Sequence, residues 1–331
     1  MTTQTPEKQK SFTERFTPRW ISNAIKERKK QGWQNFIEKH KDNTNVTQIN
    51  DCADQGAKLR LEARASEIIG TSAGFAEATT DLQAAGLLVD ALSALDAAPH
   101  AKSKKHKNVF LVNVAPRNGE AKKHENGTPF CYFRYKGTLV VATVDGLTLS
   151  LLKKLKLIDS VQVVDIPTVL PILKKEGIIS EEEVSQIAET QFRSYEFSPR
   201  LALYLSRRGE IQSKTKRIED VKDAPLAAWY LDTFAKYGNV KTAILPEDVF
   251  SPDVVEQLQS GTSKKQIATL ETKFGVLPVY RRLKDVEDNG KPAVIVGSSG
   301  IGNKKFLEIV VQGGNAAKQL GIGLGDLIVV R

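Results

Sequence analysis

Residues 230–242 read YLDTFAKYGNVKT, and the same C-terminal third contains GSSG at 297–300, FLEI at 306–309 and GGNAAKQLGIGLGD at 313–326. Short apolar segments alternate here with turns rich in Gly, Pro and Asn. This pattern is typical of short strands joined by tight connections. The sequence therefore predicts a small antiparallel β-barrel over residues 226–331.

The composition is that of a globular protein. The chain has 331 residues, of which 40% are hydrophobic, so it can bury a sizeable core and is long enough for two domains. No apolar segment approaches the roughly 20 residues that cross a bilayer, and the N-terminus lacks the apolar run of a secretory signal. The two cysteines, Cys52 and Cys131, suit a reducing compartment and are not spaced as zinc ligands. We therefore expect a cytoplasmic protein with no contact to a membrane.

The net charge of +9 is concentrated in clusters such as KERKK at 26–30 and KSKKHK at 102–107. Trp20 and Trp33 flank the first cluster and would suit stacking on bases, but their spacing also fits an amphipathic helix that docks on the main body. Because no known nucleic-acid module accompanies them, we do not expect nucleic acid as a partner. Residues 1–44 are predicted to form a basic helical extension.

Residues 45–205 alternate between strand-like and helix-like patterns. Strand-like runs occur at 46–49, 109–114, 138–142 and 161–164, and helical patterns occur at about 75–95 and 147–155. This alternation predicts an N-terminal α/β/α sandwich, in which one sheet lies between layers of helices. The charged stretch 206–225 is predicted to be the linker to the C-terminal domain.

The start of a further helix is marked by Ser180, which lies three residues before Glu183. This spacing predicts a capping box. The segment Gly70-Thr-Ser72-Ala-Gly74 fits the nucleophile elbow of an acyl hydrolase, but the rest of that pattern is missing and no histidine follows position 124. We therefore do not assign a hydrolase triad.

The order and spacing of the C-terminal segments resemble the fluorinase, chlorinase and hydroxide adenosyltransferase superfamily, whose members displace methionine from S-adenosylmethionine at the ribose C5′. The resemblance extends over about residues 46–331. It implies an N-terminal α/β domain that binds substrate, a C-terminal β-barrel and a homotrimer. In that trimer the pocket lies between the first domain of one subunit and the second domain of a neighbour.

The ribose position implied by the resemblance is Asp51. Asn50-Asp51 closes the first strand and resembles the family's Thr-Asp-Phe-Gly element, although Cys52 and Ala53 replace the aromatic residue and the glycine. A carboxylate suits the ribose diol because it accepts hydrogen bonds from both hydroxyls. The same aspartate also fits the cap of a following helix.

The methionine positions implied by the resemblance lie in the C-terminal domain. Asp232 and Asn239 match the residues beside the methionine amino group, and Tyr237 takes the place of an aromatic cover over adenine or methionine. Ser298 and Ser299 match the turn that faces the methionine carboxylate. Taken singly, these segments also fit an ordinary hairpin turn and an ordinary loop.

The nucleophile side departs from the family. Hydroxide-transferring members hold the attacking water with an Asp, an Arg and a His, but residues 114–119 here read VAPRNG and lack the aspartate. Arg193 stands where the histidine would be, and Ser194 matches the serine that holds halide in the halogenating members. These two residues are the implied catalytic positions.

The identity of a general base for the attacking water stays open, because several groups lie near the altered loop. Lys122 or Lys123 would stand near the family's arginine, while His124 is either a base in a new place or a solvated loop residue. Asp145 resembles a turn residue that shapes the floor of the pocket, and we expect it to be structural.

Three functions therefore remain. The resemblance favours hydrolysis of S-adenosylmethionine to adenosine and methionine, with no cofactor and no metal. Arg193 and Ser194 would instead support a halide adenosyltransferase, although the arginine brings a cation toward a sulfonium substrate. The third alternative is a catalytically silent protein that binds S-adenosylmethionine or adenosine.

Overall fold

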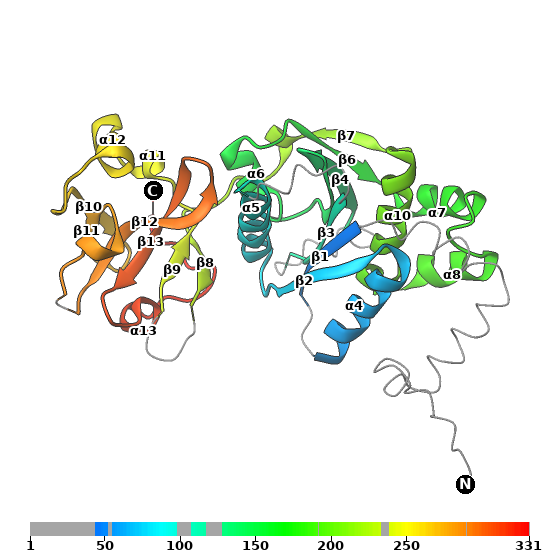
Figure 1. The fold of residues 1–331 in the computed structure, drawn as a ribbon, viewed down its shortest axis with the longest axis horizontal. Coiled ribbons are helices and arrows are strands. Elements are labelled where there is room, and N and C mark those ends of the chain that lie inside the picture. Colours follow the sequence, from blue (N-terminus) through cyan, green and yellow to red (C-terminus); the bar gives the residue numbers. More distant parts are fainter. Residues whose placement is uncertain are drawn as a thin grey trace, which may run out of the picture. The chain divides into compact units, whose positions relative to one another are not determined.

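The computed structural model describes residues 44–51, 55–97, 107–116, 128–190, 192–232, 238–288 and 290–330. The chain divides into two units, Met1–Asp42 and Asn43–Arg331, and the described residues belong to the second. Two β-sheets with their helices make up this unit (Figure 1), so the expected mixed α/β class is confirmed. Apart from Thr44, the helical extension predicted over residues 1–44 lies outside the described residues.

The first sheet has seven strands in the order β2-β1-β3-β5-β4-β6-β7. Strands β2, β1, β3 and β5 are parallel, and β4, β6 and β7 continue the sheet with antiparallel pairs. The strand bounds are β1 Thr44–Asn50, β2 Thr71–Glu77, β3 Lys107–Asn113, β4 Phe130–Tyr135, β5 Thr138–Thr143, β6 Ser160–Val164 and β7 Lys214–Arg217.

Helices cover both faces of this sheet. Phe110 and Val112 of β3 pack into a buried cluster with α5 and α6, whereas Val109 and Leu111 pack into another with α4, α7 and α10. Successive strand residues point to opposite faces, so one apolar strand serves both layers. The helix bounds are α4 Gln55–Ile68, α5 Asp81–Ala97, α6 Ser150–Leu155, α7 Ile166–Lys175, α8 Glu181–Glu189, α9 Arg193–Glu196 and α10 Ser198–Arg208.

The helix predicted at about residues 75–95 begins later than expected. Residues 71–77 form β2 beside β1, and α5 starts only at Asp81. TSAGFAE has no clear strand signal of its own, and its pairing with β1 decides its conformation. Ser72 therefore lies inside a strand and not at the strand-to-helix turn that a nucleophile elbow needs.

The second sheet has six strands in the order β10-β11-β12-β13-β9-β8. Its pairs are antiparallel except for β11 with β12, which is parallel. No pairing among the described residues joins β10 to β8, so closure into a barrel stays a prediction. The bounds are β8 Ala228–Leu231, β9 Val240–Thr242, β10 Ala268–Thr272, β11 Gly275–Tyr280, β12 Pro292–Ile301, β13 Lys304–Val311, α11 Pro246–Val249, α12 Pro252–Ser260 and α13 Ala316–Leu320.

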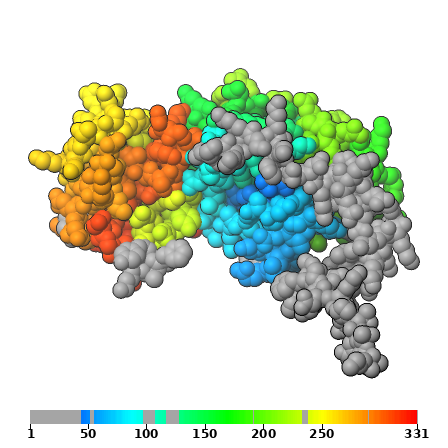
Figure 2. All heavy atoms as spheres, in the orientation of Figure 1, coloured from blue at the N-terminus to red at the C-terminus, as the bar shows by residue number. Residues whose placement is uncertain are grey.

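Residues 206–225, predicted as the linker, contain the end of α10, strand β7 and the short 3₁₀ helix Ile218–Asp220. Helix α5 also packs against the second sheet. Trp229 of β8 lies so close to Gly86 of α5 that a Cβ at position 86 would be 2.3 Å from the indole ring. In the space-filling view, α4 (blue) lies on the face that is shown (Figure 2). Among the described residues, every helix is too short or too polar to span a membrane.

Candidate functional site

The carboxyl ends of the parallel strands form one edge of the first sheet. Asp51 follows β1 there, and its N–H donates to the Asn113 carbonyl at the end of β3 over 3.3 Å. Thr128 reaches the same edge from the antiparallel side, because Phe130 of β4 pairs with Thr143, the last residue of β5. In open α/β sheets this edge is where ligands bind. The structure therefore puts Asp51 at the end of β1, as the sequence predicts, and its contact with substrate stays a prediction.

Arg193 reaches this edge from α9. Its Nη1 donates to the Thr128 carbonyl oxygen over 3.2 Å, and burial lowers the pKa of the guanidinium. Arginine nevertheless remains a cation at neutral pH. Ser194 follows on the same helix and is buried. Both implied catalytic residues thus come from one short helix that contacts Thr128, two residues before β4.

Two buried polar atoms at this edge lack hydrogen-bond partners in the described structure. They are Asn50 Oδ1 and Thr128 Oγ1, and each residue is only 2% exposed. A buried polar group without a partner is uncommon and calls for an explanation. Sequence reasoning missed both groups. Asn50 was visible only as the neighbour of Asp51, and nothing in the local pattern distinguishes Thr128.

The Asp145 turn is held against the start of α5. Asp81 Oδ2 accepts from the Leu147 N–H over 2.8 Å, while Asp81 Oδ1 accepts from the Leu82 N–H. Gly146, which lies between Asp145 and Leu147, has φ +70°, and a Cβ at this position would lie 2.3 Å from Asp81 Oδ2. The glycine is required by both its conformation and its close contact. This turn therefore shapes the edge beside β5.

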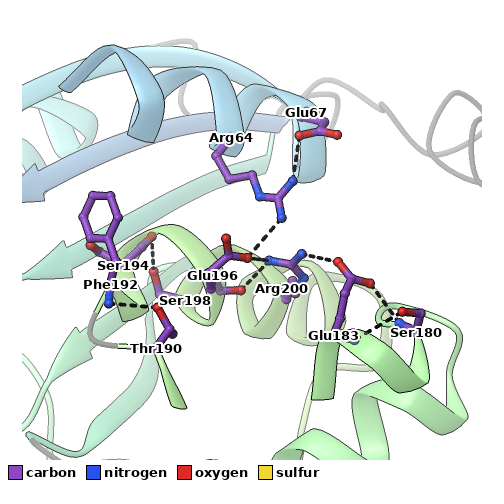
Figure 3. A network of polar contacts seen from close by, with 10 residues as sticks. All are labelled: Arg64, Glu67, Ser180, Glu183, Thr190, Phe192, Ser194, Glu196, Ser198 and Arg200. Atoms are coloured by element: carbon purple, nitrogen blue, oxygen red, sulfur yellow. Dashed lines mark hydrogen bonds and ion pairs between the residues drawn. The ribbon is translucent and has the colours of Figure 1, made fainter. Parts of the chain in front are cut away.

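A chain of buried ion pairs holds α9 in place (Figure 3). Glu196 of α9 accepts from Arg64 of α4 over 3.1 Å and from Arg200 of α10 over 2.8 Å. Arg200 also donates to Glu183 of α8 over 2.6 Å. The other Glu183 oxygen accepts from the Ser180 N–H over 2.9 Å. The short helix that carries Arg193 and Ser194 is therefore tied to three other helices.

Positive and negative side chains alternate along this series of ion pairs, so that each buried charge has an opposite charge beside it. Desolvation lowers the pKa of Arg200, whereas for Arg64 the nearby carboxylates of Glu67 and Glu196 outweigh desolvation and raise the pKa. Figure 3 also shows Ser194 beside Ser198, whose hydroxyl donates to the Ser194 carbonyl over 3.1 Å. Backbone and side-chain bonds together fix the direction of α9.

Asp232 and Asn239, two of the methionine-side residues, lie opposite each other at the end of the β8–β9 pair. The Asp232 N–H donates to the Asn239 carbonyl over 3.0 Å. Gly238 lies against Asn315, whose side-chain nitrogen would be 2.4 Å from a Cβ at position 238. Segments 230–242 and 313–326 therefore meet in space. Tyr237 lies outside the described residues.

The Gly-Ser-Ser-Gly segment interrupts the β12–β13 ladder, whose register shifts between Val296 and Gly300. Ser298 is exposed, and its N–H donates to Glu308 Oε1 over 3.1 Å. Ser299 is 2% exposed and donates to Asp90 Oδ2 of α5 over 3.0 Å. The two serines therefore have different surroundings.

Asp90 is bound from two further directions. The Gly300 N–H donates to its Oδ1 over 3.2 Å, and Lys241 Nζ lies 3.3 Å from its Oδ2. Lys241 Nζ also donates to the Ser299 hydroxyl over 2.7 Å. Sequence reasoning missed Asp90, Lys241 and Glu308, because their partners become neighbours only after the sheets form.

The described residues at these positions offer the parts of a displacement site. A carboxylate stands at one sheet edge with a half-buried cation and two hydroxyl side chains, and a second carboxylate stands at the end of β8 in the other sheet. Such a set can orient a substrate with a diol and an amino acid group. Lys122, Lys123 and His124, for which the sequence predicts a possible place near the nucleophile, lie outside the described residues.

Comparisons with known proteins agree with the C-terminal pattern. A crystal structure of an uncharacterized conserved protein from Thermotoga maritima is similar, with a TM-score of 0.53 and 17% identity over 85% of this chain and 97% of that chain. At that identity the likeness shows the fold alone. None of the curated proteins that were compared matches the chain. Residues 228–329 match the family of the SAM hydroxide adenosyltransferase C-terminal domain, where SAM is S-adenosylmethionine, so the resemblance is confirmed for this part of the chain.

Proposed function

We propose that the protein binds S-adenosylmethionine and hydrolyses it to adenosine and methionine. The observation that carries the proposal is the family match of residues 228–329, within which Asp232, Asn239 and the segment around Asn315 meet at the end of the β8–β9 pair. The position of Asp51 at the ligand-binding edge of the first sheet supports it independently.

Substrate binding divides between the two sheets. Asp51 accepts hydrogen bonds from the two ribose hydroxyls. Asp232 accepts from the methionine ammonium group with Asn239 beside it, and Tyr237 covers an apolar face of the substrate. The turn at Ser298 and Ser299 faces the methionine carboxylate. These contacts hold the C5′–S bond in a fixed direction, which lowers the entropy cost of an in-line attack.

The chemical step needs no acid for its leaving group. A water oxygen forms a bond to C5′ while the C5′–S bond breaks. The electron pair of the C5′–S bond passes to the sulfonium sulfur, and methionine leaves as a neutral thioether. The attached water loses one proton to solvent when the site opens to release the products, and it becomes the 5′-hydroxyl of adenosine. Arg193 and Ser194 hold the water at the sheet edge, and a site closed to bulk solvent favours the attack.

One observation favours a second candidate, a halide adenosyltransferase. The guanidinium of Arg193 lies at the same edge as Ser194 and is partly buried. A halide between this cation and the sulfonium would be attracted by both. It would form a C5′–halogen bond as the C5′–S bond breaks, and no proton would be transferred.

The test is incubation of the purified protein with S-adenosylmethionine, with and without chloride, followed by chromatography of adenosine, 5′-chloroadenosine and methionine. Equal amounts of adenosine and methionine are expected without chloride. A product that requires chloride would favour the second candidate. Calorimetric binding without any product would leave a binding protein, and absence of both would overturn the proposal.

Asp51→Ala should lower kcat/KM for adenosine release by roughly 10- to 100-fold, because two hydrogen bonds to a charged group are lost. Ser194→Ala should act mainly on kcat. The matched control is Asp165→Ala, since Asp165 also follows a strand and caps α7 through the Thr168 N–H over 3.2 Å. That change should cost about 1 kcal/mol of stability and leave kcat/KM intact. Equal kinetics for Asp51→Ala and Asp165→Ala would show that Asp51 is only a cap.

A further inference from the structure

Thr128 carries a buried hydroxyl without a partner at the edge that holds Arg193. Its residue is 2% exposed, and Oγ1 makes no hydrogen bond in the described structure. The carbonyl oxygen of the same residue accepts from Arg193 Nη1 over 3.2 Å. Covalent geometry therefore keeps the unsatisfied hydroxyl within a few ångströms of the carbonyl that binds the cation.

Two other buried threonines have hydrogen-bond partners for their hydroxyls. Thr143 Oγ1 donates to the Val114 carbonyl over 3.2 Å, and Thr242 Oγ1 donates to the Leu307 carbonyl over 2.7 Å. A hydroxyl that is buried without a bond lowers stability, and a valine of the same shape would avoid that loss. A polar group of this kind at a ligand-binding edge points to a contact that forms with a ligand.

The chemistry of the hydroxyl suits a water molecule as that ligand. A threonine oxygen can accept a hydrogen bond from one O–H group of the water. This leaves a lone pair of the water oxygen free to attack C5′. Arg193 has only donors and cannot take that role. An enclosed position also separates the nucleophile from bulk solvent.

We propose that the Thr128 hydroxyl is a catalytic group that holds the attacking water together with Arg193 and Ser194. The inference rests on the proposed hydrolysis of S-adenosylmethionine and adds a residue that the family resemblance does not supply. In the step described above, Thr128 accepts a hydrogen bond and does not itself lose or gain a proton. The proton of the attached water passes to solvent.

Thr128→Val tests the proposal because stability and turnover should move in different directions. The unfolding temperature should stay the same or rise, since an unsatisfied hydroxyl is removed from the interior. The kcat for adenosine release should fall by about 10- to 100-fold, the effect of losing one hydrogen bond in the transition state, with little change in KM. Thr128→Ser retains the hydroxyl and should recover most of kcat.

The matched control is Thr242→Val, which removes a buried hydroxyl that has a partner. It should lower the unfolding temperature and leave kcat unchanged. A Thr128→Val protein with full kcat would overturn the proposal, and so would one whose unfolding temperature falls as far as that of Thr242→Val. If the wild-type protein forms no adenosine at all, the proposed hydrolysis fails and the inference fails with it. If the wild-type protein and the Thr128→Val variant form adenosine at the same rate, the inference about Thr128 is refuted and the proposed hydrolysis still stands.

Discussion

The two adjacent serines of the Gly-Ser-Ser-Gly segment show what single residues reveal only in three dimensions. The sequence predicts the turn but cannot rank Ser298 against Ser299. In the structure Ser299 is enclosed and bonded to Asp90 and Lys241, whereas Ser298 is exposed and held by Glu308. We therefore expect Ser298 to contact ligand and Ser299 to hold the turn in position.

Substitution of each serine by alanine separates these roles. Ser298→Ala should weaken binding of S-adenosylmethionine and leave adenosine binding unchanged, because only the former has the methionine carboxylate. Ser299→Ala should lower the free energy of unfolding by about 1 kcal/mol, since the half-buried Asp90 carboxylate loses a donor. Calorimetry and denaturant unfolding measure the two effects. Equal stability losses in both variants would contradict the assignment.

At the scale of elements, the network around α9 combines a predictable part with an unpredictable one. The capping box at Ser180 and Glu183 is a local pattern, and the structure confirms it. The bond between Arg64 and Glu196 joins residues 132 positions apart, and neither periodicity nor capping rules reach that far. The sequence therefore identifies α8 but not the contacts that connect it to the candidate site.

Removal of the Glu196 charge should destabilise the protein strongly. Glu196→Gln leaves the buried guanidinium groups of Arg64 and Arg200 with less compensation, and breaking a buried pair costs about 3–5 kcal/mol. The control is Glu176→Gln, which breaks the exposed pair with Arg208 and should change stability little. Urea unfolding compares the two. A Glu196→Gln protein as stable as Glu176→Gln would show that the network contributes little.

Four strands of the first sheet were predicted from runs of apolar residues, whereas β4, with the apolar sequence FCYFRY, was missed. Those at β1, β3, β5 and β6 agree with the predicted strands to within two residues or so. Strand β2 was not found, because TSAGFAE becomes a strand only beside β1. Strand β7, with the sequence KTKR, has no apolar signal, and its pairing with β6 defines it.

For the whole molecule, the proposed binding residues lie on two sheets, with Asp51 in the first and Asp232 in the second. The resemblance implies that a complete pocket combines the first domain of one subunit with the second domain of another. Neither the homotrimer nor this division of the pocket follows from a single chain, so both remain predictions. The candidate residues are identified in the sequence, whereas the trimer is implied only by the family resemblance.

Mixed assemblies test that arrangement. Asp51→Ala and Asp232→Ala proteins should each release adenosine much more slowly than wild type, but their mixture should regain part of the lost rate after subunit exchange, because some pockets then contain both aspartates. Asp51→Ala mixed with Ser194→Ala should not recover, since both changes lie in the first domain. Native mass spectrometry would confirm the exchange. Exchange without recovered activity would mean that each pocket belongs to one chain.

The hairpin at the centre of the first sheet has a consequence for how the chain folds. Strands β4 and β5 are joined by Lys136 and Gly137 alone, with φ angles of +46° and +87°, which is the conformation of a type I′ turn. Such hairpins close within about 1–10 μs, whereas parallel neighbours such as β1 and β3 must bring distant segments together. The middle of the sheet is thus the part that can form first, and it provides the template on which the slower outer strands assemble.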